Sequence, residues 1–535
     1  MNEIKLNLGS GKDYIQDWIN VDIEEQYHPD VLADITKPLP FSDGSASYIK
    51  AYDILEHVTK EDAPVFISEC YRVLHSRGTL SLRTPNMFSI IDSYREDPEV
   101  MAHFLYGDTS ETGVYGAHKA GYTEKSLRRL LLLNGFTEIH IETEHTNYVV
   151  TAVKDDTPFK KNLTIGILQQ SADYGGAEAY MLALAQQWKN DSHAVHAATS
   201  AGKFYDDMEK IATSVQKYSS TVDFIGDWKG FIKTFLLLPF SFMTYSRLLW
   251  HFRQKRVDVV VMSEFSERML VALLAWVYRI PLVWIEYGRP HDTFKRMFPW
   301  SKVIFRLLKD IPARYITPTQ YVQKSLMTDG RVSLSKIDVI PCGTAIPRVD
   351  KKISRKKPFV IGCISRLAPE KGQRDVIESM PDLLKKHAVQ LWIIGTGPDE
   401  AYLKESAKRL GVHNHVLFKG FVKENEDVYK DIDCVVFSST WELEGFGLVL
   451  IEAMARGIPV VASSIGPVSE VVGDASLIYE PGDREQLYDH LTHLIEDRTL
   501  AHSLASKGRK RVKEKFSIEA SAQKMIESFR TVLCE

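Results

Sequence analysis

The chain has 535 residues, of which 44% are apolar and 25% are charged, a composition typical of globular proteins. This length exceeds what a single hydrophobic core usually supports, so several domains are expected. The net charge of −4 argues against nucleic acid as a partner. Five widely separated cysteines without a CxxC pair indicate neither a zinc motif nor a disulfide framework, which favours a reducing cytosol.

Short apolar runs alternate with amphipathic segments along most of the chain, a pattern typical of α/β folds with parallel sheets. The N-terminus enters a strand pattern directly, so no secretory signal peptide is expected. Charged, proline-containing pauses predict the domain boundaries. The predicted parts are a first domain over 1–154, a linker over 155–162, two halves of a second fold over 163–350 and 358–515, and a C-terminal crossing helix over 516–535.

The first domain opens with LNLGSGK, which predicts a strand that ends in a Gly-x-Gly turn at Gly9 and Gly11. Glycines in this position let the backbone approach a ligand closely. Asp22 ends the next predicted strand, and its carboxylate suits the hydroxyl groups of a ribose. Only ten residues separate Gly11 from Asp22, so the helix between the strands is expected to be cut to one or two turns.

Further segments of this domain extend the pattern: Leu55–His57 after the fourth strand, RVLHSRGTLSLRTPN leading to the fifth strand, and a closing helix and strand from His118 to Glu144. Together these segments resemble class I S-adenosylmethionine-dependent methyltransferases over residues 4–153. The resemblance implies that the glycine turn holds the amino-acid part of the cofactor and that Asp22 binds its ribose. It also implies that Asp34 lies near the adenine. Asn7 stands where an acid is common, and a dinucleotide-binding domain is the alternative.

An O-methyltransferase needs a base beside the acceptor hydroxyl, and histidine titrates in the useful range. His57 and His118 are the candidates for this catalytic role. The alternative for each is a structural histidine that only forms hydrogen bonds.

The most apolar stretch, Phe235–Phe252, is interrupted by Pro239 and Arg247 and is too short to span a bilayer. We expect a helix that faces the core. Its aromatic residues and the adjacent Lys255 and Arg256 leave open an interfacial helix, which would make the protein peripheral to the inner face of the plasma membrane.

Two glycine-containing turns precede predicted helices in the second fold. A strand leads to Gly175 and Gly176, and the helix start that follows suits a diphosphate or an incoming acceptor. Further along, Gly447 breaks the chain before the helix LVLIEAMAR, whose first amides, at Gly447 and Leu448, suit a phosphate.

Charged side chains flank these turns. Arg366 and Lys371 follow a buried strand and have the donors that a leaving pyrophosphate needs. Glu444 precedes the apolar helix, where it can face a transferred sugar. Glu452 lies inside the helix, with seven residues between it and Glu444. It needs a partner against the cost of burial, and ribose hydroxyls would provide one.

From Leu163 onward the motifs resemble retaining glycosyltransferases of family 4, whose B fold consists of two facing Rossmann-like halves. The resemblance implies that Arg366 and Lys371 contact the donor phosphates, that the two glutamates grip one nucleotide diphosphate sugar, and that Phe421 contacts the base. No metal ion is expected. A glycosidase with paired carboxylates is disfavoured, because it needs no phosphate-binding cations. His291 is a candidate on the acceptor side or an ordinary loop histidine.

These observations predict a cytoplasmic, bifunctional enzyme of surface-polysaccharide or glycolipid assembly. One part is expected to transfer a sugar from a nucleotide sugar to a glycan or lipid-linked glycan, and the other to methylate a glycan hydroxyl with S-adenosylmethionine. The alternative is an active glycosyltransferase whose first domain is a non-catalytic, methyltransferase-like module that binds the acceptor.

Overall fold

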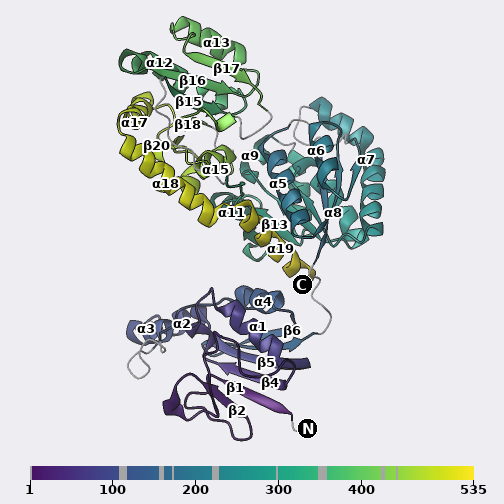
Figure 1. Cartoon of the computed structure of the whole chain (residues 1–535). Coiled ribbons are helices and arrows are strands. Elements are labelled where there is room, and N and C mark those ends of the chain that lie inside the picture. Colours follow the sequence, from purple (N-terminus) through teal and green to yellow (C-terminus); the bar gives the residue numbers. More distant parts are fainter. Residues whose placement is uncertain are drawn as a thin grey trace. The chain divides into compact units, whose positions relative to one another are not determined.

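The computed structural model describes residues 3–107, 117–155, 162–171, 174–219, 228–296, 299–347, 358–422, 428–440 and 444–534. The chain forms two compact units, Met1–Lys161 with Arg530–Glu535, and Asn162–Phe529 (Figure 1). Most of the predicted linker over 155–162 and the pause over 351–357 lie outside the described residues. The finer domain boundaries therefore stay predictions.

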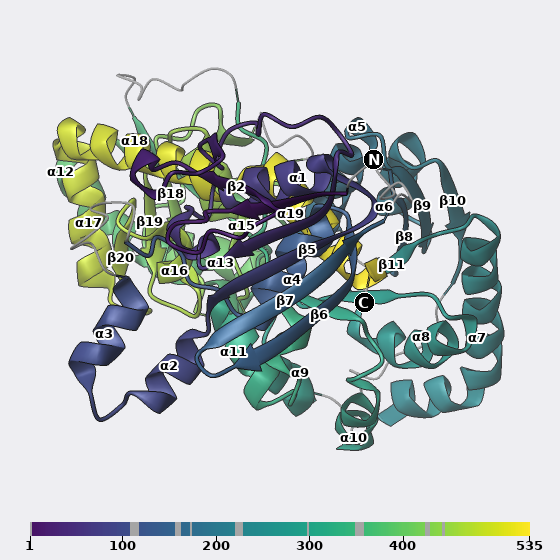
Figure 2. The same ribbon diagram turned by 90° about the horizontal axis from the view of Figure 1, so that it is seen from below.

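The first unit is built on one seven-stranded sheet in the described part of the chain. In spatial order its strands are β3 (Val31–Leu32), β2 (Ile19–Asp22), β1 (Ile4–Leu8), β4 (Ala46–Tyr52), β5 (Leu74–Pro85), β7 (Asn147–Lys154) and β6 (Phe136–Glu144). All neighbours are parallel except the pairs that β7 forms with β5 and β6, and Figure 2 shows these three long strands side by side. Strand order reverses between β1 and β4, so ligands are expected at the carboxyl ends of these strands.

Helices surround this sheet because their apolar residues recur at helical spacing. In α1 the buried side chains are Ala63, Phe66, Ile67, Cys70 and Val73, which form one stripe against the sheet. Helix α1 spans Ala63–Val73. The other helices are α2 (Met87–Ser93), α3 (Pro98–Tyr106) and α4 (Glu124–Leu133), and the 3₁₀ turns are η1 (Glu25–Tyr27) and η2 (Leu55–His57).

The connection between β1 and β2 contains turns but no helix, so the prediction of one or two helical turns was wrong. The side chain of Asn20 explains the difference. It accepts from Ile15 N at 2.9 Å and donates to Ile15 O at 2.9 Å, which ties the connection into a compact loop. Asp17 completes this loop with a positive φ of 66°, a conformation that does not continue a helix.

The first half of the larger unit contains a second parallel sheet, with seven strands among the described residues. In spatial order they are β10 (Ser214–Lys217), β9 (Ala194–Thr199), β8 (Thr164–Gln169), β11 (Val259–Met262), β12 (Leu282–Ile285), β13 (Arg314–Thr317) and β14 (Ile337–Val339). The helices are α5 (Gly176–Asn190), α6 (Lys203–Ile211), α7 (Trp228–Gln254), α8 (Phe265–Tyr278), α9 (Pro290–Arg296), α10 (Pro299–Leu308) and α11 (Gln320–Thr328), with the 3₁₀ turn η4 (Leu334–Lys336).

The second half contains a parallel sheet with six strands in the described ranges. Their order is β17 (Val416–Gly420), β16 (Val389–Ile394), β15 (Phe359–Ile364), β18 (Cys434–Phe437), β19 (Val460–Ser463) and β20 (Leu477–Tyr479). The helices are η5 (Pro369–Lys371), α12 (Gln373–Lys386), α13 (Glu400–Arg409), α15 (Leu448–Ala455), α16 (Val468–Val472), α17 (Arg484–Glu496), α18 (Arg498–Lys515) and α19 (Ile518–Cys534). The predicted helix after the glycine break is α15.

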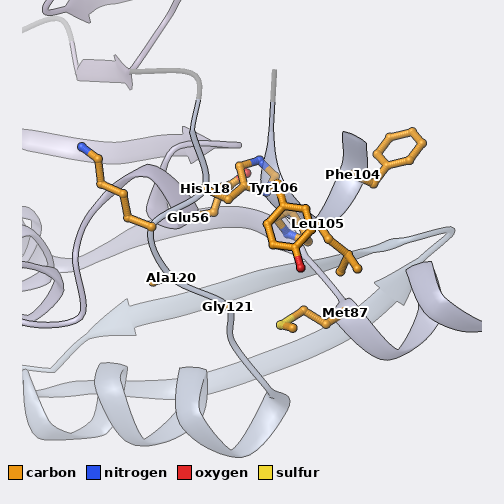
Figure 3. Close-up of a pocket in the computed structure, with 10 residues that line it drawn as sticks. Glu56, Met87, Phe104, Leu105, Tyr106, His118, Ala120 and Gly121 are labelled. Carbon is orange, nitrogen blue, oxygen red and sulfur yellow. The ribbon is translucent and has the colours of Figure 1, made fainter. Parts of the chain in front are cut away.

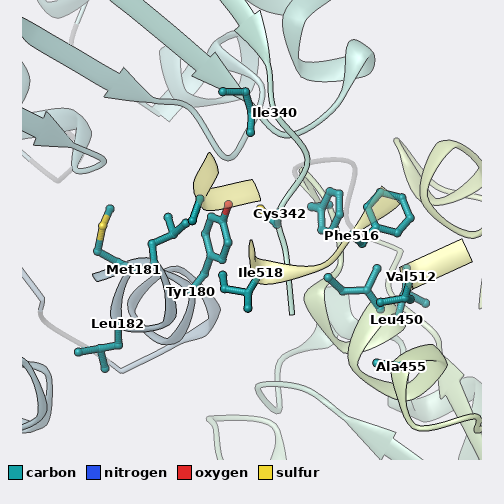
Figure 4. Packing of buried hydrophobic residues seen from close by; sticks show 14 of the residues in the cluster. Tyr180, Met181, Leu182, Ile340, Cys342, Leu450, Ala455, Val512, Phe516 and Ile518 are labelled. Carbon is teal, nitrogen blue, oxygen red and sulfur yellow. The ribbon is translucent and has the colours of Figure 1, made fainter. Parts of the chain in front are cut away.

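The two halves share a hydrophobic core where the chain passes between them. Cys342 lies against Phe516 and Ile518 in this core (Figure 4). The two crossing segments are also hydrogen-bonded, because Thr344 N donates to Phe516 O at 2.9 Å and Ile518 N donates to Thr344 O at 3.1 Å. After this crossing, α19 packs back onto the first half through a hydrogen bond between Ser521 Oγ and the Tyr180 hydroxyl, at 2.6 Å.

A second contact between the halves depends on a glycine. A Cβ atom at Gly445 would lie 1.3 Å from the carbonyl oxygen of Tyr287, so no other residue fits without a shift of the backbone. The carbonyl oxygen of Gly445 also accepts a hydrogen bond from Thr319 Oγ1 of the first half, at 3.2 Å. The loop before α15 is therefore fixed against the opposite half.

The apolar stretch Phe235–Phe252 forms most of α7, but only one face of this helix is buried. Tyr245, Leu249 and Phe252 are in the core, whereas an opposite stripe of apolar side chains faces solvent. The exposed members are Ile232, Phe235, Leu236, Phe240, Phe242, Met243 and Trp250. The prediction of a core-facing helix thus holds for one face of α7 and not for the opposite face. Among the described residues, no helix is both long and apolar enough to cross a membrane.

Candidate functional site

The predicted donor site lies where strand order reverses in the last sheet, between β15 and β18. The segments that leave the carboxyl ends of these strands are held together by Gly372, which has a φ of +64°. A Cβ atom there would lie 1.9 Å from Ser438 O. Ser438 Oγ in turn donates to Lys371 O at 2.9 Å. Residues about 70 positions apart in the sequence thereby meet at one edge.

An ion pair occupies this edge. Lys371 Nζ donates to Glu444 Oε2 at 2.6 Å, and the two side chains are only 14% and 17% exposed. A pair this buried costs desolvation, and its geometry must offset that cost. An anionic ligand that replaced the carboxylate on the lysine would leave Glu444 free for another partner.

The second predicted cation, Arg366, lies on the same loop but is more exposed. Its guanidinium pairs with Glu370 at 3.1 Å, one helical turn away in sequence. Exposed pairs of this kind are weak, so the guanidinium can exchange its partner at little cost. Both predicted phosphate-binding cations are thus held near one strand end by carboxylates.

Glu452 lies inside α15, with Leu450, Ile451, Ala453 and Met454 buried around it. Its partner in the structure is Tyr429, whose hydroxyl donates to Glu452 Oε2 at 2.7 Å. Burial raises the pKa of Glu452, and the Tyr429 hydrogen bond and the Arg456 guanidinium oppose that rise. The expected need for a partner is met, but sequence reasoning missed Tyr429, which shares no spacing motif with the glutamate.

The two glycine turns face each other across the halves. Gly447 has a φ of +82° and directly precedes the first residue of α15, Leu448. A Cβ atom at Gly176, the first residue of α5, would lie 3.2 Å from Leu448 Cδ1. Gly175 caps α5, and its amide donates to Glu178 Oε2 at 2.9 Å. The starts of two helices from opposite halves therefore meet at Leu448, four residues after Glu444 in the chain.

Phe421 follows β17 and is 54% exposed. It faces the first half instead, where its ring lies edge-on to Tyr174 at 6.4 Å between centroids. Lys203 Nζ lies 4.6 Å from the Phe421 ring centroid and 3.7 Å from that of Tyr174. These three side chains form an aromatic and cationic rim between the halves.

The acceptor-side candidate His291 lies on α9. Its Nδ1 pairs with Asp329 Oδ1 at 3.2 Å, and the imidazole is half-exposed on α9. Closer to the strand end, Glu286 is buried and pairs with Arg268 at 2.6 Å. His291 therefore stays a candidate for the acceptor side, with Asp329 as a partner of its imidazole in the structure.

In the first unit, the glycine turn and the acid come together as predicted. Gly9 and Gly11 both have positive φ values, of 63° and 43°. Gly11 N donates to Asp22 Oδ2 at 2.7 Å, and Glu24 N donates to Asp22 Oδ1 at 2.9 Å. The positive φ favours glycine at Gly9, and a Cβ atom there would also lie 2.0 Å from the end of the Ile54 side chain.

Two further residues complete this edge of the first sheet. Asp34 lies just beyond β3, and its carboxylate accepts from Thr36 and pairs with Lys37 at 3.1 Å. Asn7, the departure from the family pattern, is buried and donates to Asp13 O at 2.7 Å and to Asn20 Oδ1 at 3.0 Å. The glycine turn fits the amino-acid part of S-adenosylmethionine, and the acids fit its nucleoside part. Asn7 instead holds the loop between β1 and β2 through its two hydrogen bonds.

A cavity of about 150 Å³ lies beside the carboxyl end of β4 (Figure 3). Its lining combines apolar and polar side chains, namely Glu56, Pro85, Met87, Phe104, Leu105, Tyr106, His118, Lys119, Ala120 and Gly121. A cavity of this size holds a molecule about as large as a six-membered ring. His118 thus lines a cavity, as a residue that acts on a bound acceptor must.

His57, His118 and Glu56 form one cluster at this cavity. The imidazole rings meet edge to face, with centroids 5.0 Å apart. Burial lowers the pKa of both histidines and raises the pKa of Glu56 to about 8. Sequence reasoning missed Glu56, although it lies between two residues of the quoted segment Leu55–His57. The signal in the sequence that could have identified Glu56 is its position next to the candidate base His57, shortly after a strand.

Three family models match consecutive parts of the chain. Residues 11–82 match a methyltransferase domain, residues 174–346 match Glycosyltransferase Family 4, and residues 347–511 match Glycosyl transferases group 1.

Curated relatives are similar over shorter stretches. The chain is 28% identical over 253 residues to the lipopolysaccharide core biosynthesis mannosyltransferase LpsB of Rhizobium meliloti, which covers 45% of this chain and 70% of that protein. It is 30% identical over 186 residues to a GDP-mannose-dependent phosphatidylinositol monomannoside mannosyltransferase of Mycobacterium tuberculosis, covering 33% and 48%. It is 32% identical over 181 residues to the capsular polysaccharide biosynthesis glycosyltransferase CapM of Staphylococcus aureus, covering 33% and 47%. The chain thus spans about half the length of the last two.

Solved structures show the fold of the larger unit. HepE from Anabaena, in complex with UDP and glucose, has a TM-score of 0.56 at 23% identity and covers 69% of this chain and 99% of its own. A glycosyltransferase from Rickettsia africae has a TM-score of 0.58 at 18% identity, with 70% and 99% covered. The chain therefore combines a methyltransferase-type domain with a B-fold glycosyltransferase, in the order that the sequence predicts.

Proposed function

We propose that this chain is a bifunctional enzyme of surface-polysaccharide or glycolipid assembly. The larger unit transfers a glycosyl residue from a nucleotide diphosphate sugar with retention of configuration, and the first unit methylates a glycan hydroxyl. The observation that carries the proposal is the buried pair of Lys371 and Glu444, on the segments that lead to α12 and α15.

The donor site follows from the chemistry of these groups. Lys371 and Arg366 bind the diphosphate, and the α15 start adds backbone amides that carry partial positive charge. Glu452, already positioned by Tyr429, accepts from ribose hydroxyls. When the donor phosphate pairs with Lys371, the Glu444 carboxylate is released and accepts hydrogen bonds from hydroxyl groups of the transferred sugar. The leaving phosphate helps to take the acceptor proton, so no protein nucleophile is required.

The names of the relatives support the substrate class. They include enzymes of lipopolysaccharide core, capsular polysaccharide and phosphatidylinositol mannoside synthesis. The HepE complexes contain UDP and UDP-glucose. We infer a nucleoside diphosphate sugar as donor and a glycan or lipid-linked glycan as acceptor.

Methylation is assigned to the edge of the first sheet. S-adenosylmethionine supplies a methyl group that is bound to a sulfonium sulfur. In the transfer the bond between methyl carbon and sulfur breaks while the bond between methyl carbon and acceptor oxygen forms. Gly9, Gly11 and Asp22 hold this cofactor. The acceptor sugar lies in the cavity, where an imidazole of the cluster, His57 or His118, accepts the proton of its hydroxyl group as the C–O bond forms.

A non-catalytic module that binds the acceptor is the second candidate for the first unit. The observation that favours it is Asp22, whose two carboxylate oxygens already accept from Gly11 N and Glu24 N. These contacts use about half of the accepting capacity of the Asp22 carboxylate and so leave less of it for a ribose. Cofactor binding separates the two functions.

We further propose that the larger unit rests on an anionic membrane at the inner face of the plasma membrane. The exposed apolar stripe of α7 ends in Trp250, whose ring lies 6.2 Å from that of Tyr278 on α8, and the preceding residues Trp276 and Val277 are 72% and 65% exposed. Contiguous exposed apolar side chains indicate a contact surface. Exposed basic residues follow at the same ends of the two helices, namely Arg247, Arg253, Lys255, Arg256 and Arg279. Apolar and basic side chains together suit anionic lipids.

Replacement of Lys371 with methionine or Arg366 with alanine is expected to lower sugar transfer by about 100-fold or more, because each removes a donor to developing phosphate charge. The measurement is the initial rate with a panel of nucleotide sugars. Arg374→Ala removes a neighbouring cation that pairs with Glu378 and should transfer sugar at the wild-type rate. Full transfer by both site variants would refute the assignment.

Nucleotide binding should weaken with falling pH through Glu452. Its raised pKa means that the carboxylate is protonated, and stops accepting from ribose, at a higher pH than an ordinary glutamate. We expect the dissociation constant of the preferred nucleoside diphosphate to rise between pH 7 and 5 more steeply for wild type than for Glu452→Gln. Phosphate protonation is common to both proteins, so parallel curves would exclude this role.

S-adenosylmethionine should bind the intact chain in a calorimetric titration, and Asp22→Asn should weaken binding about tenfold, because a charge-assisted hydrogen bond contributes about 1.5–3 kcal/mol. Asp92→Asn, on exposed α2, is the matched control. Absence of cofactor binding by the wild-type chain would favour the non-catalytic module.

Leu236→Glu with Phe240→Glu should reduce cosedimentation with vesicles that contain anionic lipid by about tenfold or more, since each places a charge in the apolar interface. Leu334→Glu alters an apolar side chain that is similarly exposed on η4 and should bind vesicles like wild type. Equal sedimentation of all three proteins would show that this face does not contact lipid.

A further inference from the structure

We propose that Glu56, His57 and His118 form a binding site for a divalent transition-metal ion of the zinc class. One potential ligand atom from each residue lies within 4.8 Å of the others. Two imidazoles and one carboxylate are the ligand set of one class of catalytic zinc site. The role given to the metal below rests on the proposed methyl transfer, but metal binding itself does not.

Each of the three side chains is oriented by a second group, as metal ligands commonly are. Thr84 Oγ1 donates to Glu56 Oε2 at 3.0 Å. His57 Nδ1 lies 3.0 Å from Ala117 O, so this nitrogen carries the proton and Nε2 offers its lone pair. A ring nitrogen of His118 donates to the backbone carbonyl of Leu105, which leaves its other nitrogen available.

These contacts come from different elements of the first unit. Glu56 and His57 belong to η2 after β4, Thr84 lies in β5, and the carbonyls belong to the segments that flank 108–116. A buried carboxylate is costly without a cation or several hydrogen bonds, and Glu56 is only 2% exposed. A metal ion bound by the two imidazoles would provide that charge compensation.

The position of the cluster gives the ion access to a ligand. Glu56 and His118 line the cavity of about 150 Å³, and Figure 3 shows both side chains beside Tyr106 at its wall. With three protein ligands, a tetrahedral ion keeps a coordination position for a ligand in the cavity. A sugar hydroxyl placed there would bind the ion through its oxygen.

The metal would change how the hydroxyl is activated. A bound cation lowers the pKa of a coordinated hydroxyl, as it does for water. The O–H bond then breaks with its proton passing to water, and the resulting alkoxide oxygen attacks the methyl carbon while the C–S electron pair goes to sulfur. In this arrangement both imidazoles remain ligands, and neither is a free base.

Titration of the intact, metal-free chain with Co²⁺ tests the site, since cobalt in a zinc site has visible absorption. We expect saturation at one equivalent per chain and displacement of the cobalt by Zn²⁺. His57→Asn, His118→Asn and Glu56→Gln should each raise the cobalt dissociation constant at least about tenfold. His140→Asn removes an exposed imidazole on β6 and should leave binding unchanged.

A variant that replaces an orienting group tests the site without removing a ligand. Thr84→Val should weaken cobalt binding by about tenfold, with the same absorption bands at saturation. Wild-type protein that gives no saturable cobalt spectrum, or ligand variants that bind like His140→Asn, would overturn the proposal. Because cofactor and acceptor are absent from this titration, cobalt binding by a chain that fails to methylate would refute only the proposed methylation.

Discussion

The ion pair between Lys371 and Glu444 is the interaction on which the larger unit's proposed chemistry depends. The two residues lie on loops that leave neighbouring strands, and the carboxyl ends of parallel strands bring these loops to one edge. At this edge each charge compensates the other. A nucleotide diphosphate sugar can replace both partners at once, because its phosphates can pair with Lys371 and its sugar hydroxyl groups can donate to Glu444. Binding can therefore exchange partners without leaving a buried charge uncompensated.

The same principle organises all three sheets. In each, strand order reverses beside the first strand of the fold, and the candidate residues follow the strands at that point. The contact of Gly445 with Tyr287 adds a second requirement for the larger unit, since the site is complete only where the two halves meet. The hydrogen-bonded crossing at Thr344 and Phe516 provides the other fixed point between the halves.

Much of this arrangement could be predicted from local patterns. Rules on backbone conformation predict the strands that end in glycine turns and the helix after Gly447. These elements in turn predicted the fold, with Glu444 before the helix and Glu452 inside it. Partners distant in sequence could not be predicted, because no spacing rule links Tyr429 to Glu452 or Thr84 to Glu56. The missing helix after Gly11 depends on the Asn20 side chain, which competes with the helix for backbone groups.

The most direct test of the central claim is nucleoside diphosphate binding by Glu444→Gln, measured by calorimetry beside wild type. If the carboxylate holds Lys371 in the free protein, neutralising it releases the lysine for phosphate. The account then expects the variant to bind the diphosphate at least as tightly as wild type while it loses sugar transfer. Loss of diphosphate binding together with transfer would contradict the exchange of partners at this ion pair.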